Sequence, residues 1–176
     1  MMNEILNAMK TRRSVRKFAP TPVAPELLRR IEEAGLYAAS GMNRQSPVIV
    51  TVTDPAKRAR LADVNREIGG WPVGFDPFYG APVVMIVLVP KTCVTGIYDG
   101  SLTIGNLMLA AHALGLGSIW IHRAKEEFER PEYRDLPRSL GLEGEWEGVG
   151  HCAIGYAADP LPPPPERKPN RVFHLN

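Results

Sequence analysis

The chain has 176 residues with a formal net charge of +2 at pH 7, and 44% of its residues are hydrophobic and 23% charged. This length suits one domain with a sizeable core. The small net charge gives no support to nucleic acid as a partner, because such binding relies on strongly basic surfaces. The basic residues therefore matter through their placement in the chain rather than through their number.

Cysteine and histidine usage argues against a disulfide scaffold and against a metal site. Cys93 and Cys152 are isolated from each other, and the histidines show no metal-ligand spacing with one another or with the cysteines. The start of the chain lacks the continuous apolar stretch of a signal peptide, and the longest apolar run, 81–90, is about half the length of a membrane span. We expect a soluble, cytoplasmic protein with reduced thiols and with no metal or membrane partner.

Hydrophobic periodicity and turn residues predict helices and strands that alternate along most of the chain. The predicted helices span 3–12, 21–40, 54–70, 99–115 and 131–141, the last of them broken at Pro137. The predicted strands span 47–53, 82–89, 116–122 and 148–157. This order supports a layered α/β or α+β domain.

Local signals add detail to two of these segments. In the helix predicted at 54–70, Asp54 suits the N-cap, Pro55 the first turn and Gly69 the position beyond the end. The strand predicted at 82–89 is apolar on both faces, which indicates a central strand.

The remaining segments predict one buried helix and two stretches without regular structure. The apolar residues that indicate a largely buried helix at 99–115 are Leu102, Leu107, Met108, Ala111 and Leu114. The stretch 69–82 is rich in Gly and Pro and predicts a long surface loop. Residues 160–165 include five prolines and favour polyproline II. Behind this stiff spacer, "RVFHL" (171–175) has strand-like content and predicts docking on a partner subunit by strand addition.

Four cations surround Ser14 in the stretch "TRRSVRKF": Arg12, Arg13, Arg16 and Lys17. One interpretation is a solvated helix C-terminus, where cations gain roughly 0.3–1 kcal/mol from the helix dipole. The other is a phosphate site, because Arg12 and Arg16 would share a face if the stretch were helical. We favour the phosphate, because each charge-assisted bond to it contributes about 1.5–3 kcal/mol. A second basic group, able to converge on the same anion, follows in the tail at Arg167, Lys168 and Arg171.

The stretch "AASGMNRQSP" (38–47) is a polar turn between a predicted helix and a predicted strand. It is interpreted either as an ordinary helix end and loop or as a cluster of amides and hydroxyls that hydrogen-bonds a planar heterocycle. The side chains able to do so are those of Ser40, Asn43 and Gln45.

The glycines of "GLGSIWIHR" (115–123) do not form a Rossmann fingerprint, because the third glycine is missing and the glycines follow a helix instead of a strand. The sequence also lacks a Walker lysine, a G-x-S-x-G elbow and an H-E-x-x-H motif. Since no acid, base or nucleophile constellation is found, an enzyme with this sequence would rely on a bound cofactor for its chemistry.

Together these segments resemble the flavin-dependent nitroreductase superfamily over nearly the whole chain. The resemblance rests on the order and spacing of "RRSVRKF", "SGMNRQSP", "FYGAPVVMIVLV", "DGSLTIGNLMLAAHALGLGSIWIHR", "GHCAIGYA" and "RKPNR". It implies an α+β nitroreductase-like fold with a central mixed β-sheet flanked by helices and a C-terminal extension exchanged with the partner subunit. Residues 1–159 would form the FMN-binding domain, and 160–176 the proline-rich tail that embraces the partner.

The resemblance further implies a homodimer with FMN at its interface, and it assigns cofactor contacts by position. The FMN phosphate, ribityl chain and pyrimidine edge would be contacted by Arg12, Arg13, Ser14 and Arg16, and the phosphate would be closed off by Lys168 and Arg171. The residues reaching the flavin from the other subunit would be Ser40, Gly41 and Asn43. The backbone groups approaching the flavin N5 and O4 edge would be those of Trp120, Ile121, His122 and Arg123.

The activity implied by the resemblance is that of an FMN-dependent NAD(P)H oxidoreductase. NADH or NADPH would reduce FMN, and the reduced cofactor would pass electrons to nitroaromatics, quinones or similar acceptors in ping-pong turnover. No side chain is assigned as a catalytic acid or base, and Arg16 is expected to stabilise negative charge on the reduced ring. The alternatives are a flavin-based dehalogenase, a flavin-degrading enzyme of the same superfamily, a non-catalytic dimer that stores or senses FMN, and a phosphate-binding domain without flavin.

Overall fold

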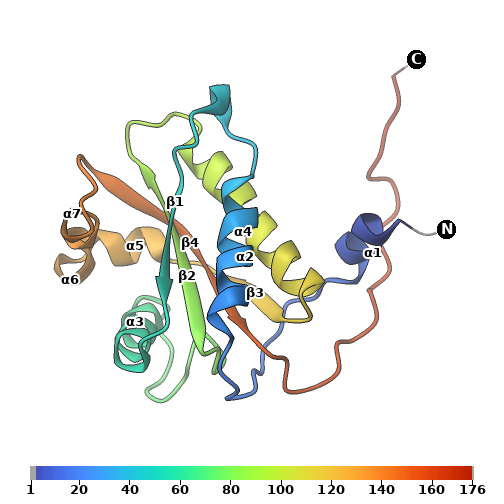
Figure 1. Cartoon of the computed structure of the whole chain (residues 1–176), viewed down its shortest axis with the longest axis horizontal. Coiled ribbons are helices and arrows are strands. Elements are labelled where there is room, and N and C mark those ends of the chain that lie inside the picture. Colours follow the sequence, from blue (N-terminus) through green and yellow to red (C-terminus); the bar gives the residue numbers. More distant parts are fainter. Residues whose placement is uncertain (1–2, 176) are drawn as a thin grey trace.

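The computed structural model of the chain describes residues 3–175 and confirms an α+β architecture (Figure 1). The strands are β1 (Val48–Val52), β2 (Val83–Pro90), β3 (Gly117–Ile121) and β4 (Trp146–Gly155). The longer helices are α1 (Glu4–Thr11), α2 (Pro25–Leu36), α3 (Pro55–Ile68) and α4 (Gly96–Ala113). The short ones are the 3-10 turn η1 (Gly41–Asn43), α5 (Ala124–Glu129), α6 (Pro131–Arg134) and α7 (Leu136–Ser139).

The four strands form one sheet in the order β1-β2-β4-β3, and every neighbouring pair is antiparallel. The sheet is therefore antiparallel where a mixed one was predicted, and an isolated parallel bridge outside the named strands joins Ser14 to Ser118 at the outer edge of β3. Strand β2 is buried along nearly its whole length, as a central strand must be. Its alternate residues serve two cores, one against α2 and α4 and the other against α3 and α5 (Figure 1).

Helix α3 confirms the predicted start and stop signals. The Asp54 side chain accepts a hydrogen bond from the backbone N–H of Lys57, which satisfies one of the free donors of the first turn. Pro55 occupies the first turn and Gly69 is the C-cap.

Helix α4 is largely buried as predicted, but Leu102 is not part of its buried face and is 51% exposed. Leu107 and Ala111 are fully buried, and Ile104 joins them at helical spacing. The prediction for Leu102 was wrong because a residue two positions from Ile104 lies roughly 200° around the helix axis, on the side away from the sheet.

The stretch 69–82 has no helix or strand, as predicted, yet it is not confined to the surface. Phe78 is fully buried and packs edge-on against His151, with 5.4 Å between ring centroids. The backbone around it is held by the Asp76 carboxylate, which accepts hydrogen bonds from the N–H groups of Phe78 and Gly80. Through Phe78, part of this loop thus belongs to the hydrophobic core.

The region before β4 also differs in detail from the prediction. Helix α5, which contributes the buried Phe128, has no counterpart among the predicted elements. The helix predicted at 131–141 is divided into α6 and α7 at Asp135, because Pro137 falls in the first turn of α7.

The tail beyond Asp159 is extended and exposed and runs past α1 away from the sheet (Figure 1). Its start is fixed by an ion pair between Lys17 and Asp159 and by a backbone bond from Ala158 to Lys17. The boundary at 159/160 stays a prediction, and its outer limits, 1–2 and 176, lie outside the described residues. Within 3–175, no helix has the length and apolar character needed to cross a membrane.

Candidate functional site

The basic segment that follows α1 is extended and lies along the outer edge of β3. The Val15 N–H donates to the Ser118 carbonyl at 3.1 Å, and the Phe18 N–H donates to the Tyr79 carbonyl. Val15 and Phe18 are buried and anchor the segment, whereas Ser14 is half-buried and Arg16 is exposed. Because α1 ends at Thr11, Arg12 and Arg16 do not share a helical face, and the extended chain presents them instead.

Arg12 and Arg13 play different parts at the end of α1. Arg13 donates to the carbonyls of Lys10 and Arg12, as expected of a basic residue at a helix C-terminus. Arg12 makes no such bond: its Nη1 is buried and has no hydrogen-bond partner among the described residues. A buried donor of this kind is normally satisfied, so Arg12 is suited to an anionic acceptor.

The charge of Arg12 affects the pKa values of two other residues, His112 and Cys152. Burial, followed by the nearby charges of Arg12 and Arg13, lowers the pKa of His112 on α4. Burial raises the pKa of the Cys152 thiol on β4 to about 12, with the Arg12 charge opposing the rise. The Arg12 charge thus acts on residues of both α4 and β4. The half-buried ring of Trp120 packs over Gly150 of β4.

Backbone groups of β3 line the same edge as the basic segment. The Ser118 carbonyl accepts from Val15, so the backbone groups of Ser118 point away from β4, toward the outer edge of the sheet. By strand alternation the backbone groups of Trp120 point the same way. Ile121 faces β4, where its carbonyl also meets Nδ1 of His151 at 3.2 Å. The N–H of the same peptide group, on His122, points the opposite way, toward the outer edge.

Arg123, two residues beyond β3, is the N-cap of α5 and has the left-handed conformation, with φ of 80°. Its guanidinium stacks on the Trp71 indole, 4.3 Å from the ring centroid, and Trp71 in turn contacts Phe75. The loop that contains Trp71 therefore lies against the end of β3. The bonds between the basic segment and β3 bring together the predicted contacts at 12–16 and at 120–123.

The second predicted set, Ser40, Gly41 and Asn43, forms a tight turn at the N-terminal end of α4. The Gly41 N–H donates to Asp99 at 3.0 Å, and the Ser40 hydroxyl accepts from the Gln45 N–H. Asn43 is exposed, has positive φ, and accepts a hydrogen bond from Gln45 through its side chain. A Cβ at Gly41 would collide with the Thr95 side chain, so the turn requires glycine.

Helix α4 separates the two sets within one chain. Gly41 bonds to Asp99 near the start of α4, and Thr11 bonds to His112 near its end. At 1.5 Å per residue these points are ~20 Å apart along the helix axis. The remaining predicted residues, Lys168 and Arg171, lie on the exposed tail, and no ion pair or hydrogen bond of either is found within residues 3–175.

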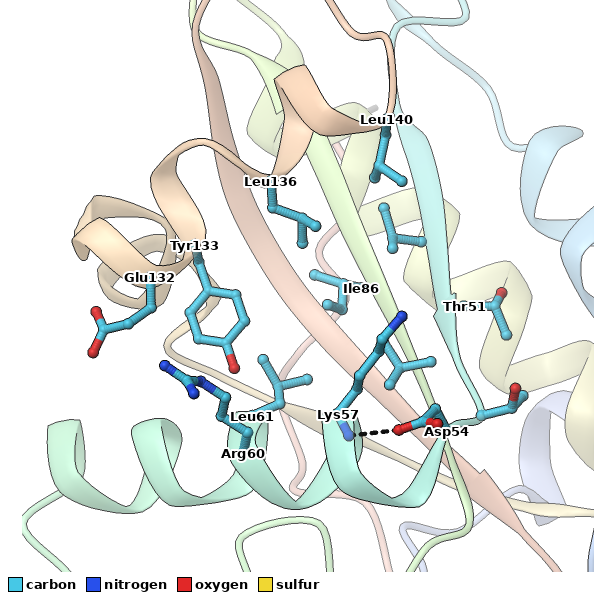
Figure 2. A pocket seen from close by; sticks show the side chains of 13 residues that line it. Thr51, Asp54, Lys57, Arg60, Leu61, Ile86, Glu132, Tyr133, Leu136 and Leu140 are labelled. Carbon is cyan, nitrogen blue, oxygen red and sulfur yellow. Dashed lines mark hydrogen bonds between the residues drawn. The ribbon is translucent and has the colours of Figure 1, made fainter.

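A groove of about 410 Å³ lies at the opposite edge of the sheet, between β1, α3 and the α6–α7 region (Figure 2). Tyr133 and Leu136 point into it toward Leu61 and Ile86. Burial is the main reason that the pKa of Tyr133 is raised to about 12. None of the residues assigned above to cofactor binding lines this groove, so it is separate from the site along β3.

One polar group next to the site has no clear signal in the sequence. Asn65, Glu127 and His151 come from α3, α5 and β4, are fully buried, and are bonded to one another. Taken one at a time in the sequence, each of these residues is typical of an amphipathic helix or an ordinary strand, so none of them indicates the group.

Comparison with known proteins identifies the family to which this fold and the site along the outer edge of β3 belong. The sequence pattern of the Nitroreductase family matches residues 9–69 and 73–156. The chain therefore belongs to the Nitroreductase family.

Individual relatives agree with this assignment. A putative NADH dehydrogenase/NAD(P)H nitroreductase of Methanothermobacter thermautotrophicus is 31% identical over 66% of this chain, and the match spans 60% of that relative's length. An FMN reductase [NAD(P)H] of Bacillus subtilis is 26% identical over 98% of this chain and 74% of its own length. The crystal structure of a nitroreductase with bound FMN from Bacteroides fragilis is 28% identical, with a TM-score of 0.90 over 99% of this chain and all of the other.

Proposed function

We propose that the protein is an FMN-dependent NAD(P)H oxidoreductase of nitroreductase type that works as a homodimer. The observation that carries the proposal is the buried Nη1 of Arg12, unpartnered among the described residues, beside the outer edge of β3, where backbone groups of Trp120 point outward. FMN offers a phosphate for the cation and a heterocycle for the backbone edge. The likeness to an FMN-bound nitroreductase and to an FMN reductase supports the same ligand.

The described residues fit FMN in three groups. Arg12, Ser14 and Arg16 would hold the phosphate, the ribityl chain and the pyrimidine edge, with Arg13 fixing the end of α1 behind them. The groups that would meet the N5 and O4 edge are the backbone of Trp120, Ile121, His122 and Arg123. The groups contributed by the second subunit would be Ser40, Gly41 and Asn43, with Lys168 and Arg171 closing on the phosphate.

Two observations support the homodimer. The separation of ~20 Å along α4 keeps the two sets of predicted contacts apart in one chain, so a second copy is needed to join them at one cofactor. Exposed apolar side chains are also found on α1, at the end of α2, in η1 and on α4, and exposed apolar surface typically marks interfaces. These side chains are Ile5, Leu6, Met9, Leu36, Tyr37, Met42, Ile97, Tyr98 and Leu102.

The protein's own residues would act by position and charge. Bound FMN supplies two-electron chemistry, accepting a hydride from NADH or NADPH and reducing a nitroaromatic, a quinone or a similar acceptor in a second half-reaction. Arg16, exposed and free to approach the pyrimidine edge, would supply positive charge there. The stack of Arg123 on Trp71 would fix one wall of the opening. Two unpaired cysteines, Cys93 and Cys152, suit the reducing cytoplasm as its place of work.

The proposal is tested by loading the purified protein with FMN and following its visible absorbance without oxygen. NADH or NADPH should bleach the flavin band, and a nitroaromatic or quinone should restore it. A flavin that binds and resists both reductants would favour storage, whereas turnover only with a halogenated substrate, or loss of the flavin in air, would favour the other activities of the superfamily. A chain that takes up no FMN contradicts the proposal.

Arg12→Ala sharpens the test, because it removes one charge-assisted bond to phosphate. We expect the FMN Kd to rise about 10- to 100-fold, corresponding to roughly 1.5–3 kcal/mol. Arg134→Ala is the matched control, since Arg134 is exposed on α6 and, among residues 3–175, pairs only with Asp135. Equal FMN affinity in the two variants would assign the basic segment another role.

Removing 160–176 tests the proposed role of the tail. If the tail embraces the partner, the truncated protein should lose dimer stability and FMN affinity together, which sedimentation and FMN titration measure. A tight, FMN-binding dimer without the tail would contradict this part of the proposal.

A further inference from the structure

Three polar side chains form a connected group in the core between α3, α5 and β4. Asn65, Glu127 and His151 each have no exposed surface. Asn65 Nδ2 donates to Glu127 Oε1 at 2.6 Å, and His151 Nε2 lies 2.7 Å from Glu127 Oε2. Burying such groups costs stability even when they are paired, and apolar side chains often do as well. The group is therefore expected to contribute more than packing.

Both ends of the group reach the backbone at the end of β3. His151 Nδ1 lies 3.2 Å from the Ile121 carbonyl oxygen, and Asn65 Nδ2 donates to the His122 carbonyl oxygen at 2.9 Å. A carbonyl only accepts, so the hydrogen bond to Ile121 requires a hydrogen on Nδ1. The buried group thus fixes two successive carbonyl groups, those of Ile121 and His122, so that they point toward the core.

Fixing these two carbonyls also fixes the donors on the other side of the backbone. In a planar trans peptide the C=O and N–H groups point in opposite directions. The N–H groups of His122 and Arg123 are consequently turned away from the core. The left-handed conformation of Arg123 belongs to the turns in which successive N–H groups make an anion-binding concavity.

We propose that Asn65, Glu127 and His151 are positioning residues that hold the N–H groups of His122 and Arg123 toward the cofactor. The inference rests on the proposed function, in which this backbone faces the N5 and O4 edge of FMN. An N–H held in advance at O4 favours the reduced cofactor, in which O4 is more electron-rich, whereas N5 carries a hydrogen once reduced and no longer accepts. The buried group therefore raises the reduction potential of bound FMN without touching it.

The test compares Asn65→Leu with the wild-type holoprotein. Leucine has the same branched arrangement of side-chain heavy atoms as asparagine and removes the donor to the His122 carbonyl. The ratio of affinities for reduced and oxidised FMN should fall about tenfold, which for a two-electron couple is a potential lower by about 30 mV. Leu61→Ala is the control, because Leu61 lies one turn earlier on α3 in the same core and does not touch β3 through a polar bond.

Equal potentials in Asn65→Leu and Leu61→Ala would overturn the inference and leave the group a structural one. Glu127→Gln is the conservative variant, since its amide can still accept from Asn65 and donate to His151. It should keep the affinity ratio within about threefold of wild type, and a tenfold loss there would contradict a role in geometry alone.

A second measurement needs only the wild-type protein. FMN titration should move the amide proton resonances of His122 and Arg123 downfield, as expected for new hydrogen bonds. If FMN binds and these two resonances do not move, the inference fails while the proposed function stands. If no FMN binds, the proposed function fails first.

Discussion

The contact of the basic segment with β3 depends on the absence of a side chain at Gly117. A Cβ built at Gly117 would lie 2.5 Å from Cγ2 of Val15, where carbon atoms normally stay about 3.5–4 Å apart. In Gly117→Ala the segment must therefore move outward by about 1 Å. The bond from the Val15 N–H to the Ser118 carbonyl, 3.1 Å long, would then exceed hydrogen-bonding range.

We expect Gly117→Ala to lower the free energy of unfolding by about 1–3 kcal/mol, the usual cost of overpacking a tight site. Urea denaturation measures this cost. The FMN Kd should rise at least about tenfold, since Arg12, Ser14 and Arg16 move with the segment. Gly105→Ala is the control, because Gly105 lies in α4 with no atom within 4 Å of its new Cβ, and alanine there should be neutral or stabilising by up to about 1 kcal/mol.

Val15→Ala removes the atoms that collide and so tests the stated cause. In the double variant the two costs should not add, with a coupling energy of about 0.5–3 kcal/mol in favour of the pair. Strict additivity, or a Gly117→Ala protein that binds FMN as tightly as wild type, would refute the reasoning.

Other predictions follow from the two thiols and from His112. Hydrogen bonds from Ser46 and Thr95 lower the pKa of Cys93, whereas burial raises that of Cys152 to about 12; iodoacetamide should label only Cys93 in the folded protein, and equal labelling would contradict these environments. Because burial and neighbouring arginines lower the pKa of His112 below 6.5, the unfolded chain binds the proton more readily. Stability present above pH 6.5 should therefore be lost as pH falls through the folded pKa, and His112→Gln should lessen this loss in denaturation curves measured between pH 7 and 5.

Features that depend on neighbours in sequence were predictable. The N-cap at Asp54 and the stop at Gly69 are decided within one helical turn, and the structure agrees. The apolar run of β2 needs only its own composition to indicate a central strand. The order of the motifs was likewise enough to indicate the family to which the chain belongs.

Features that depend on distant partners were not predictable. Phe78 is buried because His151 and the sheet lie beneath it, and nothing in its Gly- and Pro-rich surroundings announces this. The bond between Asn65 and Glu127 joins residues far apart in sequence, and so does the bond between His151 and Glu127. At the site, the cations were found from the sequence, but the separate tasks of Arg12 and Arg13 depend on where α1 ends.

The central claim is that the segment from Arg12 to Arg16 recognises the phosphate of FMN. An equilibrium titration of the flavin-free protein with FMN and with riboflavin, followed by flavin fluorescence, tests it most directly, because the two ligands differ only by that phosphate. FMN should bind at least tenfold more tightly than riboflavin, and the difference should shrink as salt is added. Equal affinities for the two ligands, or no uptake of either, would contradict the claim.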